Sequence, residues 1–219
     1  MAEVALNGTR YRAHVHDPGR LKELLFPGNR ILVSEPLARG PRKTDLDLIF
    51  AWDSEGHWVL VNSALHRPIS EKILSDPGLS PFPSLQKIVP EVSYGHGTRF
   101  DFLIFSQDGG RCFVEVKGCT LVDSQNVALF PDAPTKRGTR HLEELCEVRH
   151  QGLGAMLLIL VFRPGARAFS PNEVCDPSFA KSFWRSIKSG VSVLAKRIGF
   201  KNDWFVYTGD IPVVKGGVQ

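Results

Sequence analysis

The sequence predicts a two-domain protein of the mixed α+β and α/β class, with a small all-β domain over residues 1–62 and a larger domain over residues 63–219. Three observations predict this organisation. The first sixty residues consist of short apolar segments separated by turn residues. The rest of the chain mixes strand patterns with helical patterns, which is typical of a mixed central sheet flanked by helices. The length of 219 residues, 42% of them hydrophobic, is enough to form one or two cores.

In the first domain, Asn7-Gly8 is a strong hairpin signal between two short apolar segments. The expected strands are Ala2–Leu6, Thr9–Val15, Arg30–Glu35, Leu46–Trp52 and His57–Val61, and a short helix is expected at Arg20–Phe26. Closely spaced strands of this number are typical of a small Greek-key barrel or sandwich.

In the second domain, Ala155–Phe162 is a continuous apolar run, which is typical of a strand buried on both faces. We expect helices at Ile69–Leu74, at about Thr135–Gln151 and from Pro177 to Gly190. The expected strands are Ile88–Tyr94, Arg99–Ser106, Arg111–Val122, Asn126–Phe130, Ala155–Phe162, Val191–Ile198 and Trp204–Tyr207. This order predicts a mixed sheet with helices on both faces.

Several function classes lack their sequence signals. The longest apolar run, Leu153 to Phe162, is about half of the roughly 20 residues that cross a bilayer, and the first residues do not resemble a signal peptide. We therefore expect a cytoplasmic protein with no membrane association. The motifs of phosphate-binding loops, dinucleotide sites and serine hydrolases are absent, and the four cysteines form no C-x-x-C pair.

The charge is unevenly distributed along the chain. The net charge is +4, and residues 163–201 carry eight basic side chains against two acidic ones. A local excess of this kind attracts polyanions, nucleic acid first among them. A solvated basic surface explains the same residues, so charge alone leaves both interpretations open.

Three polar residues interrupt the apolar hairpin segments over residues 99–117. Glu115 and Lys117 share one face of their strand, about 7 Å apart. Asp101 lies in the preceding strand, and it falls opposite Glu115 on the same face if the turn centres on Asp108. A register slip would place Asp101 on the other face, so the prediction depends on this register.

This combination suits metal-assisted hydrolysis. Two converging carboxylates, Asp101 and Glu115, offer hard oxygen ligands to Mg²⁺ or Mn²⁺. Lys117 can orient or deprotonate the attacking water, or counter charge in the transition state of phosphodiester hydrolysis. An E-x-K triplet also occurs by chance in a chain of this length, and a plain Asp101–Lys117 ion pair explains the same residues.

Several segments together resemble one family. They are residues 100–103 (FDFL), 113–117 (FVEVK), 120–122 (TLV) and, as the most specific match, 130–138 (FPDAPTKRG) followed by 140–142 (RHL). Residues 19–21 (GRL) and 61–63 (VNS) add weaker support. Over nearly the whole chain, these motifs resemble the sugar fermentation stimulation protein A (SfsA) family.

The resemblance implies an N-terminal OB-fold domain and a C-terminal domain of the PD-(D/E)XK nuclease type. Family members usually begin some residues earlier, with a basic first strand, which implies either that the barrel is incomplete here, with that strand missing, or that the start of the sequence is misplaced. In that superfamily the Asp and Glu bind a divalent metal and the Lys assists the water, which falls on Asp101, Glu115 and Lys117. The superfamily often adds an acid from the first core helix, and Glu71 is the candidate metal ligand.

Two groups of residues are candidates for nucleic-acid contacts. An OB-type groove would use the basic residues of the first domain, namely Arg10, Arg12, Arg20, Lys22, Arg42 and Lys43. Residues 130–141 end at a helix N-terminus, which favours a phosphate. There Lys136, Arg137 and Arg140 would clamp the phosphate and His141 would approach the metal, although a rigid loop with a solvated basic cap fits as well.

These expectations describe a nucleic-acid-binding protein that hydrolyses phosphodiester bonds of DNA or RNA with Mg²⁺ or Mn²⁺. Two alternatives stay open. One is a DNA-binding regulator of sugar metabolism genes that retains the nuclease scaffold without turnover. The other is a metal-dependent enzyme that acts on a small phosphorylated substrate. The sequence also leaves open whether the protein is a homodimer.

Overall fold

The structure, a computed structural model, describes residues 1–17, 19–36, 42–95 and 97–216. The first domain is a five-stranded sheet in the order β1-β2-β4-β3, with β5 paired to β4. Its strands are β1 (Ala2–Leu6), β2 (Thr9–His14), β3 (Ile31–Ser34), β4 (Leu46–Trp52) and β5 (Trp58–Leu60). Asn7 and Gly8 both have positive φ, at 51° and 79°, as a tight hairpin requires.

The helix predicted at Arg20–Phe26 is wrong, because the chain makes turns there instead. Leu21 has a φ of 43°, which no right-handed helix allows. Leu21 and Leu24 are fully buried in the core of the domain, so these two apolar residues anchor a turn. Tertiary packing has overridden the local helical pattern.

The second domain contains a six-stranded sheet in the order β14-β13-β11-β8-β7-β6. Its strands are β6 (Leu85–Tyr94), β7 (Thr98–Ser106), β8 (Arg111–Cys119), β11 (Gly154–Val161), β13 (Ser192–Lys201) and β14 (Trp204–Ile211). Strands β8, β11 and β13 are mutually parallel and the other pairings are antiparallel. The prediction of a mixed central sheet after a small all-β domain is confirmed.

A second, three-stranded sheet lies beside the first and has the order β12-β10-β9. Its strands are β9 (Leu121–Val122), β10 (Val127–Phe130) and β12 (Ala168–Pro171). The sequence suggested one strand over residues 111–122, but the structure divides this segment between β8 and β9. Strand β12 was not predicted, since its short segment ends in a proline and gains its order from parallel pairing with β10.

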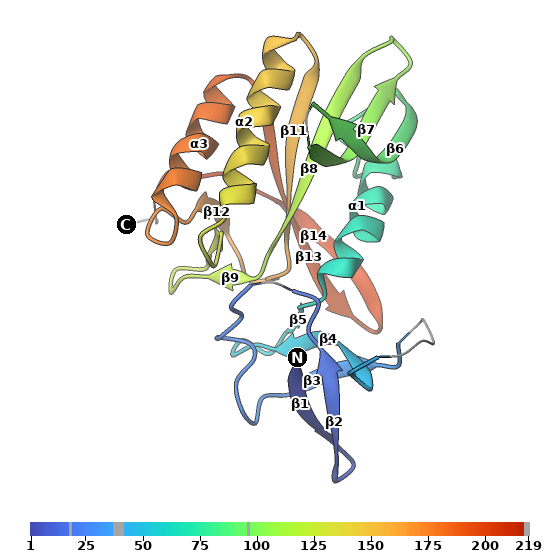
Figure 1. Cartoon of the computed structure of the whole chain (residues 1–219), viewed down its shortest axis with the longest axis vertical. Helices are drawn as coiled ribbons and strands as arrows, with labels where there is room; N and C mark the ends of the chain where they lie inside the picture. The colour runs from blue at the N-terminus through green and yellow to red at the C-terminus, as the bar shows by residue number, and fades with distance from the viewer. Residues whose placement is uncertain (18, 37–41, 96, 217–219) are drawn as a thin grey trace.

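Helices cover both faces of the six-stranded sheet (Figure 1). They are the short 3₁₀ helix η1 (Ser63–Leu65), α1 (His66–Ser75), α2 (Lys136–His150) and α3 (Pro177–Lys188). Helix α1 lies on one face, whereas α2 and α3 pack side by side on the other. Helix α2 begins after Thr135, whose side chain caps it by accepting the N–H of Gly138 at 3.0 Å.

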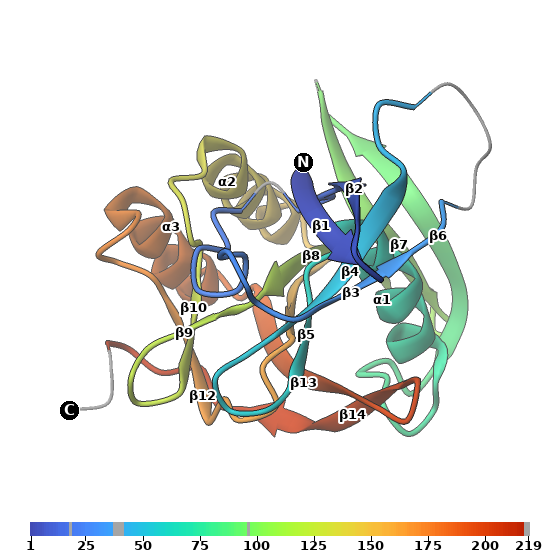
Figure 2. The same ribbon diagram turned by 90° about the horizontal axis from the view of Figure 1, so that it is seen from below.

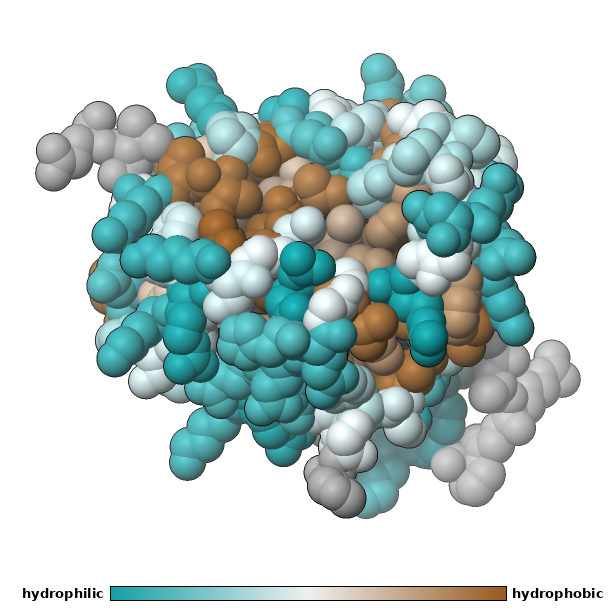
Figure 3. All heavy atoms as spheres, turned by 90° about the horizontal axis from the view of Figure 1, so that it is seen from above, coloured by the Kyte–Doolittle hydropathy of each residue, from teal (hydrophilic) through white to brown (hydrophobic). Residues whose placement is uncertain are grey.

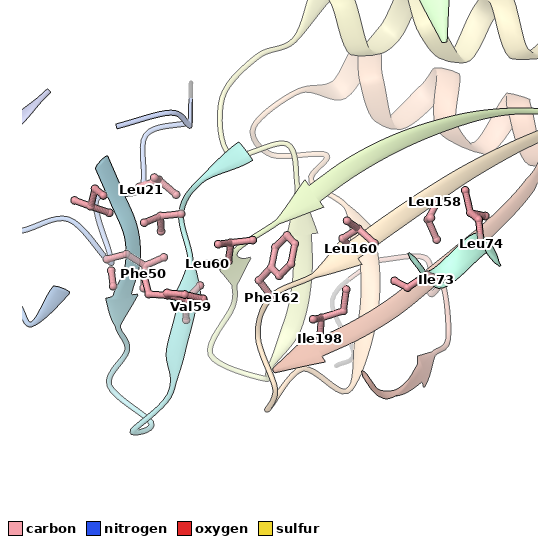
Figure 4. Close-up of a cluster of buried hydrophobic side chains, with 14 of the residues drawn as sticks. Leu21, Phe50, Val59, Leu60, Ile73, Leu74, Leu158, Leu160, Phe162 and Ile198 are labelled. Carbon is pink, nitrogen blue, oxygen red and sulfur yellow. The ribbon is translucent and has the colours of Figure 1, made fainter. Parts of the chain in front are cut away.

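One apolar core runs through both domains. Buried residues of the first domain, such as Phe50 and Leu60, belong to the same cluster as Phe162 and Ile198 of the second domain (Figure 4). Seen from below, the N-terminal strands lie over the end of the central sheet (Figure 2). Because interiors are close-packed, this shared core fixes the first domain against the second.

A second apolar cluster fills the space between the sheet and helices α2 and α3. Seen from above, the end of the molecule away from the first domain shows hydrophilic side chains around an apolar area (Figure 3). Among the described residues, no helix is both long enough and apolar enough to cross a membrane.

Candidate active site

The β7–β8 hairpin has the register that the sequence argument required. The pairs run from Phe105↔Arg111 to Phe102↔Val114, so the hairpin centres on residue 108. One further step places Asp101 across from Glu115. At that point Asp101 leaves the ladder, because its Oδ2 accepts the backbone N–H of Val116 at 2.7 Å.

The alternation of side chains between the two faces of strand β7 is interrupted at Asp101. Phe102 is buried in the core on the α1 side of the sheet, whereas Phe100 is buried in the core on the α2 side. Alternate residues of a regular strand share a face, so the strand is distorted between these two residues. Glu91 lies across from Asp101 on β6 and has a φ of 57°, which marks the same distortion on the neighbouring strand.

Glu115 is the buried acid of the site, with 3% of its surface exposed. Its Oε1 receives a hydrogen bond from Lys117 Nζ at 2.5 Å and lies against Nδ1 of His141. Its Oε2 is buried and has no hydrogen-bond partner among the described residues. A buried carboxylate oxygen without a donor is costly, so this atom is suited to a ligand that supplies positive charge.

His141, on α2, positions this carboxylate. Only 2% of its surface is exposed, so the structure places it inside the site. Nε of Arg137 donates to His141 Nε2 at 3.3 Å. Because Nε2 is then an acceptor, the ring hydrogen is on Nδ1 and points to Glu115. Lys117 Nζ lies 3.5 Å from Nδ1, which completes a compact group of four side chains.

The two carboxylates have opposite pKa shifts. Burial raises the pKa of Asp101 to about 6, and repulsion from Glu115 adds to this effect. Burial also disfavours the charge of Glu115, but the hydrogen bond from His141 and the charge of Lys117 outweigh it, so the pKa of Glu115 lies below its ordinary value. Glu115 is therefore held in its charged form, whereas ionisation of the neighbouring Asp101 is disfavoured. A divalent cation bound between them would favour the charged form of Asp101.

The predicted basic residues near α2 lie in its first two turns. Lys136, Arg137 and Arg140 are exposed there. Arg137 reaches inward to His141, and Arg140 lies 3.9 Å from Glu144. The exposed cations thus lie beside the backbone N–H groups at the N-terminus of α2.

The structure does not bring Glu71 to this group. It lies on the exposed side of α1, whose buried residues are Ser70, Ile73 and Leu74. No hydrogen bond or ion pair between described residues joins it to Asp101 or Glu115. Glu91 is the acid that sequence reasoning missed, and its negative charge contributes to the raised pKa of Asp101. The sequence feature that could have identified Glu91 is an acidic residue in the strand before β7, at the position that lies across from Asp101.

The basic residues of the first domain are dispersed. Arg10, Arg12, Arg20, Lys22 and Lys43 are exposed, and Arg42 pairs with Asp47. The basic excess over residues 163–201 does not form one patch. Arg163 and Lys196 are buried, at 3.5 Å from Asp53 and 3.0 Å from Asp210 respectively, so part of this charge serves internal ion pairs.

A cavity of about 350 Å³ adjoins the site at the junction of the two domains. Lys117 and Arg137 line it from the second domain, and Asp17 and Gly19 line it from the first. A pocket that touches a group of coupled charged residues is the usual place for a ligand.

Both domains match known protein families. Residues 1–61 match the SfsA N-terminal OB domain, and residues 62–204 match the sugar fermentation stimulation protein RE domain. The first match shows that the five-stranded sheet is an OB domain, and the second is to a restriction-endonuclease-like domain.

Three relatives illustrate the match. Sugar fermentation stimulation protein homologs from Sulfurisphaera tokodaii and Thermosipho melanesiensis are each 42% identical, over 91% and 99% of this chain and 80% and 90% of theirs. The structure of Pyrococcus furiosus SfsA, solved in complex with Ca²⁺, superimposes with a TM-score of 0.87 at 27% identity and covers 97% of this chain and 89% of that one. With both domains matched along most of its length, the chain belongs to the SfsA family.

Proposed function

We propose that the protein is a metal-dependent nuclease that hydrolyses phosphodiester bonds of nucleic acids. The observation that carries the proposal is the buried Oε2 of Glu115, which lacks a hydrogen-bond partner while Oε1 is held by Lys117 and His141. Such an arrangement leaves one oxygen directed at a ligand and fixes the carboxylate by the other. The restriction-endonuclease-like match of residues 62–204 supports the same chemistry.

The residues present fit a divalent metal. Asp101 and Glu115 would hold Mg²⁺ or Mn²⁺, since both ions prefer carboxylate oxygens. Burial, with the nearby charge of Glu115 as a smaller cause, raises the pKa of Asp101, and a bound cation would offset both effects. Pyrococcus furiosus SfsA binds Ca²⁺, a hard cation of the same preference, which supports an ion in this family. A bound metal would activate a water molecule and stabilise the leaving oxygen.

The other side chains have separate tasks. The ammonium of Lys117, which is 16% exposed, can orient the attacking water and counter charge on the phosphate. His141 holds Glu115 in place, as partners of metal ligands usually do. Lys136 and Arg140 at the start of α2 can bind the phosphates on either side of the scissile bond.

The test is cleavage of end-labelled single- and double-stranded DNA and RNA with Mg²⁺, Mn²⁺ or EDTA. Asp101→Ala and Lys117→Ala should each abolish metal-dependent cleavage. Glu147→Ala and Lys181→Ala, at exposed positions outside the site, are the matched controls and should cleave like the wild type.

Two results would contradict the proposal. Binding of nucleic acid without cleavage under any metal would favour a DNA-binding regulator that retains the scaffold. Neither binding nor cleavage would remove nucleic acid as the substrate, and the third alternative, a small phosphorylated substrate, would then be tested in its place.

A further inference from the structure

The cavity at the domain junction has chemistry of its own. Its walls come from both domains, and the shared core holds those domains in one arrangement. Its volume of about 350 Å³ lies at the small end of the range for ligand sites, about 300–1,000 Å³. A space of this size suits one nucleotide and not a duplex.

Two cationic side chains line the cavity. Lys117 and Arg137 both line it, and both are tied to His141 at the proposed active site. The start of the 15-residue helix α2, which carries Arg137, also lines the cavity through Thr135 and Gly138. Two cations beside a helix N-terminus form a favourable place for a phosphate group.

The cavity lining also includes hydrogen-bond acceptors. Asp17 and Asp132 line the cavity and meet at Gly19, against which both carboxylates pack. One oxygen of each is used to hold the loop, since Asp17 Oδ1 accepts the N–H of Gly19 at 2.8 Å and Asp132 Oδ2 accepts that of Arg20 at 2.7 Å. A carboxylate has acceptor sites beyond one such bond, which can receive sugar hydroxyl or base amino groups.

A histidine also lines this cavity. His66 lines it, and its Nε2 is buried with no hydrogen-bond partner among the described residues. The imidazole stacks on Phe162 with ring centroids 5.1 Å apart and occupies the space that a side chain on residue 118 would need. Gly118 thus leaves room for the imidazole, which forms an apolar wall of the cavity on which a base can pack.

We propose that this cavity binds the terminal nucleotide of a nucleic-acid strand. The phosphate would lie toward Lys117 and Arg137, and the sugar and base toward Asp17, Asp132 and His66. The lining thus combines cations that suit a phosphate with acceptors that suit the hydroxyl and amino groups of a sugar and base. The inference rests on the proposed function and sharpens it, because the protein then acts on strand ends.

The first test compares linear and circular single-stranded DNA of the same sequence, with Mn²⁺. We expect degradation of the linear strand and at least a tenfold slower reaction of the circle. Equal cleavage of the two would overturn the inference while leaving the nuclease proposal intact.

A second test fills the cavity. Leu121 lines it and is half-buried, so Leu121→Trp should occupy the space, whereas Leu6→Trp places the same side chain at an exposed position outside it. Calorimetry with deoxynucleoside monophosphates should show binding to the wild type and to Leu6→Trp, and at least tenfold weaker binding to Leu121→Trp. This readout needs no turnover, so it tests the cavity even if no nucleic acid is cleaved. Absence of binding to the wild type, or equal binding to both variants, would overturn the inference.

Discussion

The carboxylate of Asp132 accepts the backbone N–H of Arg20 at 2.7 Å, although the two residues are 112 positions apart. This bond joins the GRL segment of the first domain to the FPDAPTKRG segment of the second. Gly19 lies so close to Asp132 Oδ2 that any larger residue would collide with it. Two motifs that seemed independent in the sequence therefore meet at the domain junction.

Loss of this bond should destabilise the protein. We expect Asp132→Ala to lower the free energy of unfolding by about 0.5–1.5 kcal/mol, because the exposed N–H of Arg20 loses its carboxylate acceptor. Asp132→Asn keeps an acceptor oxygen and should cost clearly less. Urea denaturation of the three proteins measures the difference, and equal midpoints for the Ala and Asn variants would show that the bond contributes nothing.

Removal of His141 should weaken metal binding without unfolding the protein. His141→Ala frees Glu115 to rotate, and partners of metal ligands typically contribute 10–100-fold to affinity. His141→Asn places an N–H near the position of Nδ1 and should restore part of that affinity. Calorimetric titration with Mn²⁺ measures it, with circular dichroism as the control for folding. Unchanged Mn²⁺ affinity in His141→Ala would exclude the positioning role.

Asp101 should make the metal-free protein less stable at high pH. Its pKa of about 6 in the folded state exceeds the ordinary 3.8, so ionisation is harder in the folded chain than in the unfolded one. The penalty is complete above pH 6 and disappears as the pH falls below 4. In EDTA, Asp101→Asn should therefore be more stable than the wild type by about 3 kcal/mol at pH 8 and equal to it near pH 4. A pH-independent difference in urea unfolding would contradict this.

His66 should make the protein less stable at low pH, whereas Asp101 lowers its stability at high pH. Burial lowers the pKa of His66 to about 4, below the ordinary 6.5, so the folded state resists its protonation. Stability is retained above pH 6.5 and falls by about 3 kcal/mol as the pH drops to 4. His66→Phe in the Asp101→Asn background should remove this acid loss, and His150→Phe at an exposed position should not. If both variants retain the full acid loss in urea unfolding, the assignment to His66 is wrong.

Glu91 and Glu71 should affect Asp101 differently. The negative charge of Glu91 contributes to the raised pKa of Asp101, so Glu91→Gln should lower that pKa. Glu71→Gln should leave it unchanged, because Glu71 lies on the exposed side of α1. Carboxyl chemical shifts followed by NMR across pH 4–8 give both values. An equal response to the two variants would return Glu71 to the group of candidate metal ligands.

Much of the fold follows from local patterns. The apolar strands around a turn at Asp108 determined the hairpin register, and the register determined that Asp101 and Glu115 meet. Thr135 marked the start of α2, because an N-cap needs only neighbouring residues. These features depend on contacts over a few positions of the chain, which a sequence shows directly.

The remaining features depend on contacts between distant segments. Only the tertiary structure revealed that the segment after Gly19 forms turns, since burial of Leu21 and the bond to Asp132 outweigh its helical pattern. The same holds for His141, which the sequence offered as a nucleic-acid contact approaching the metal and which the packing of α2 against β8 places beside Glu115. The sequence determined which side chains are candidates for the chemistry, and tertiary packing decided which of their polar atoms have hydrogen-bond partners among the described residues and which have none.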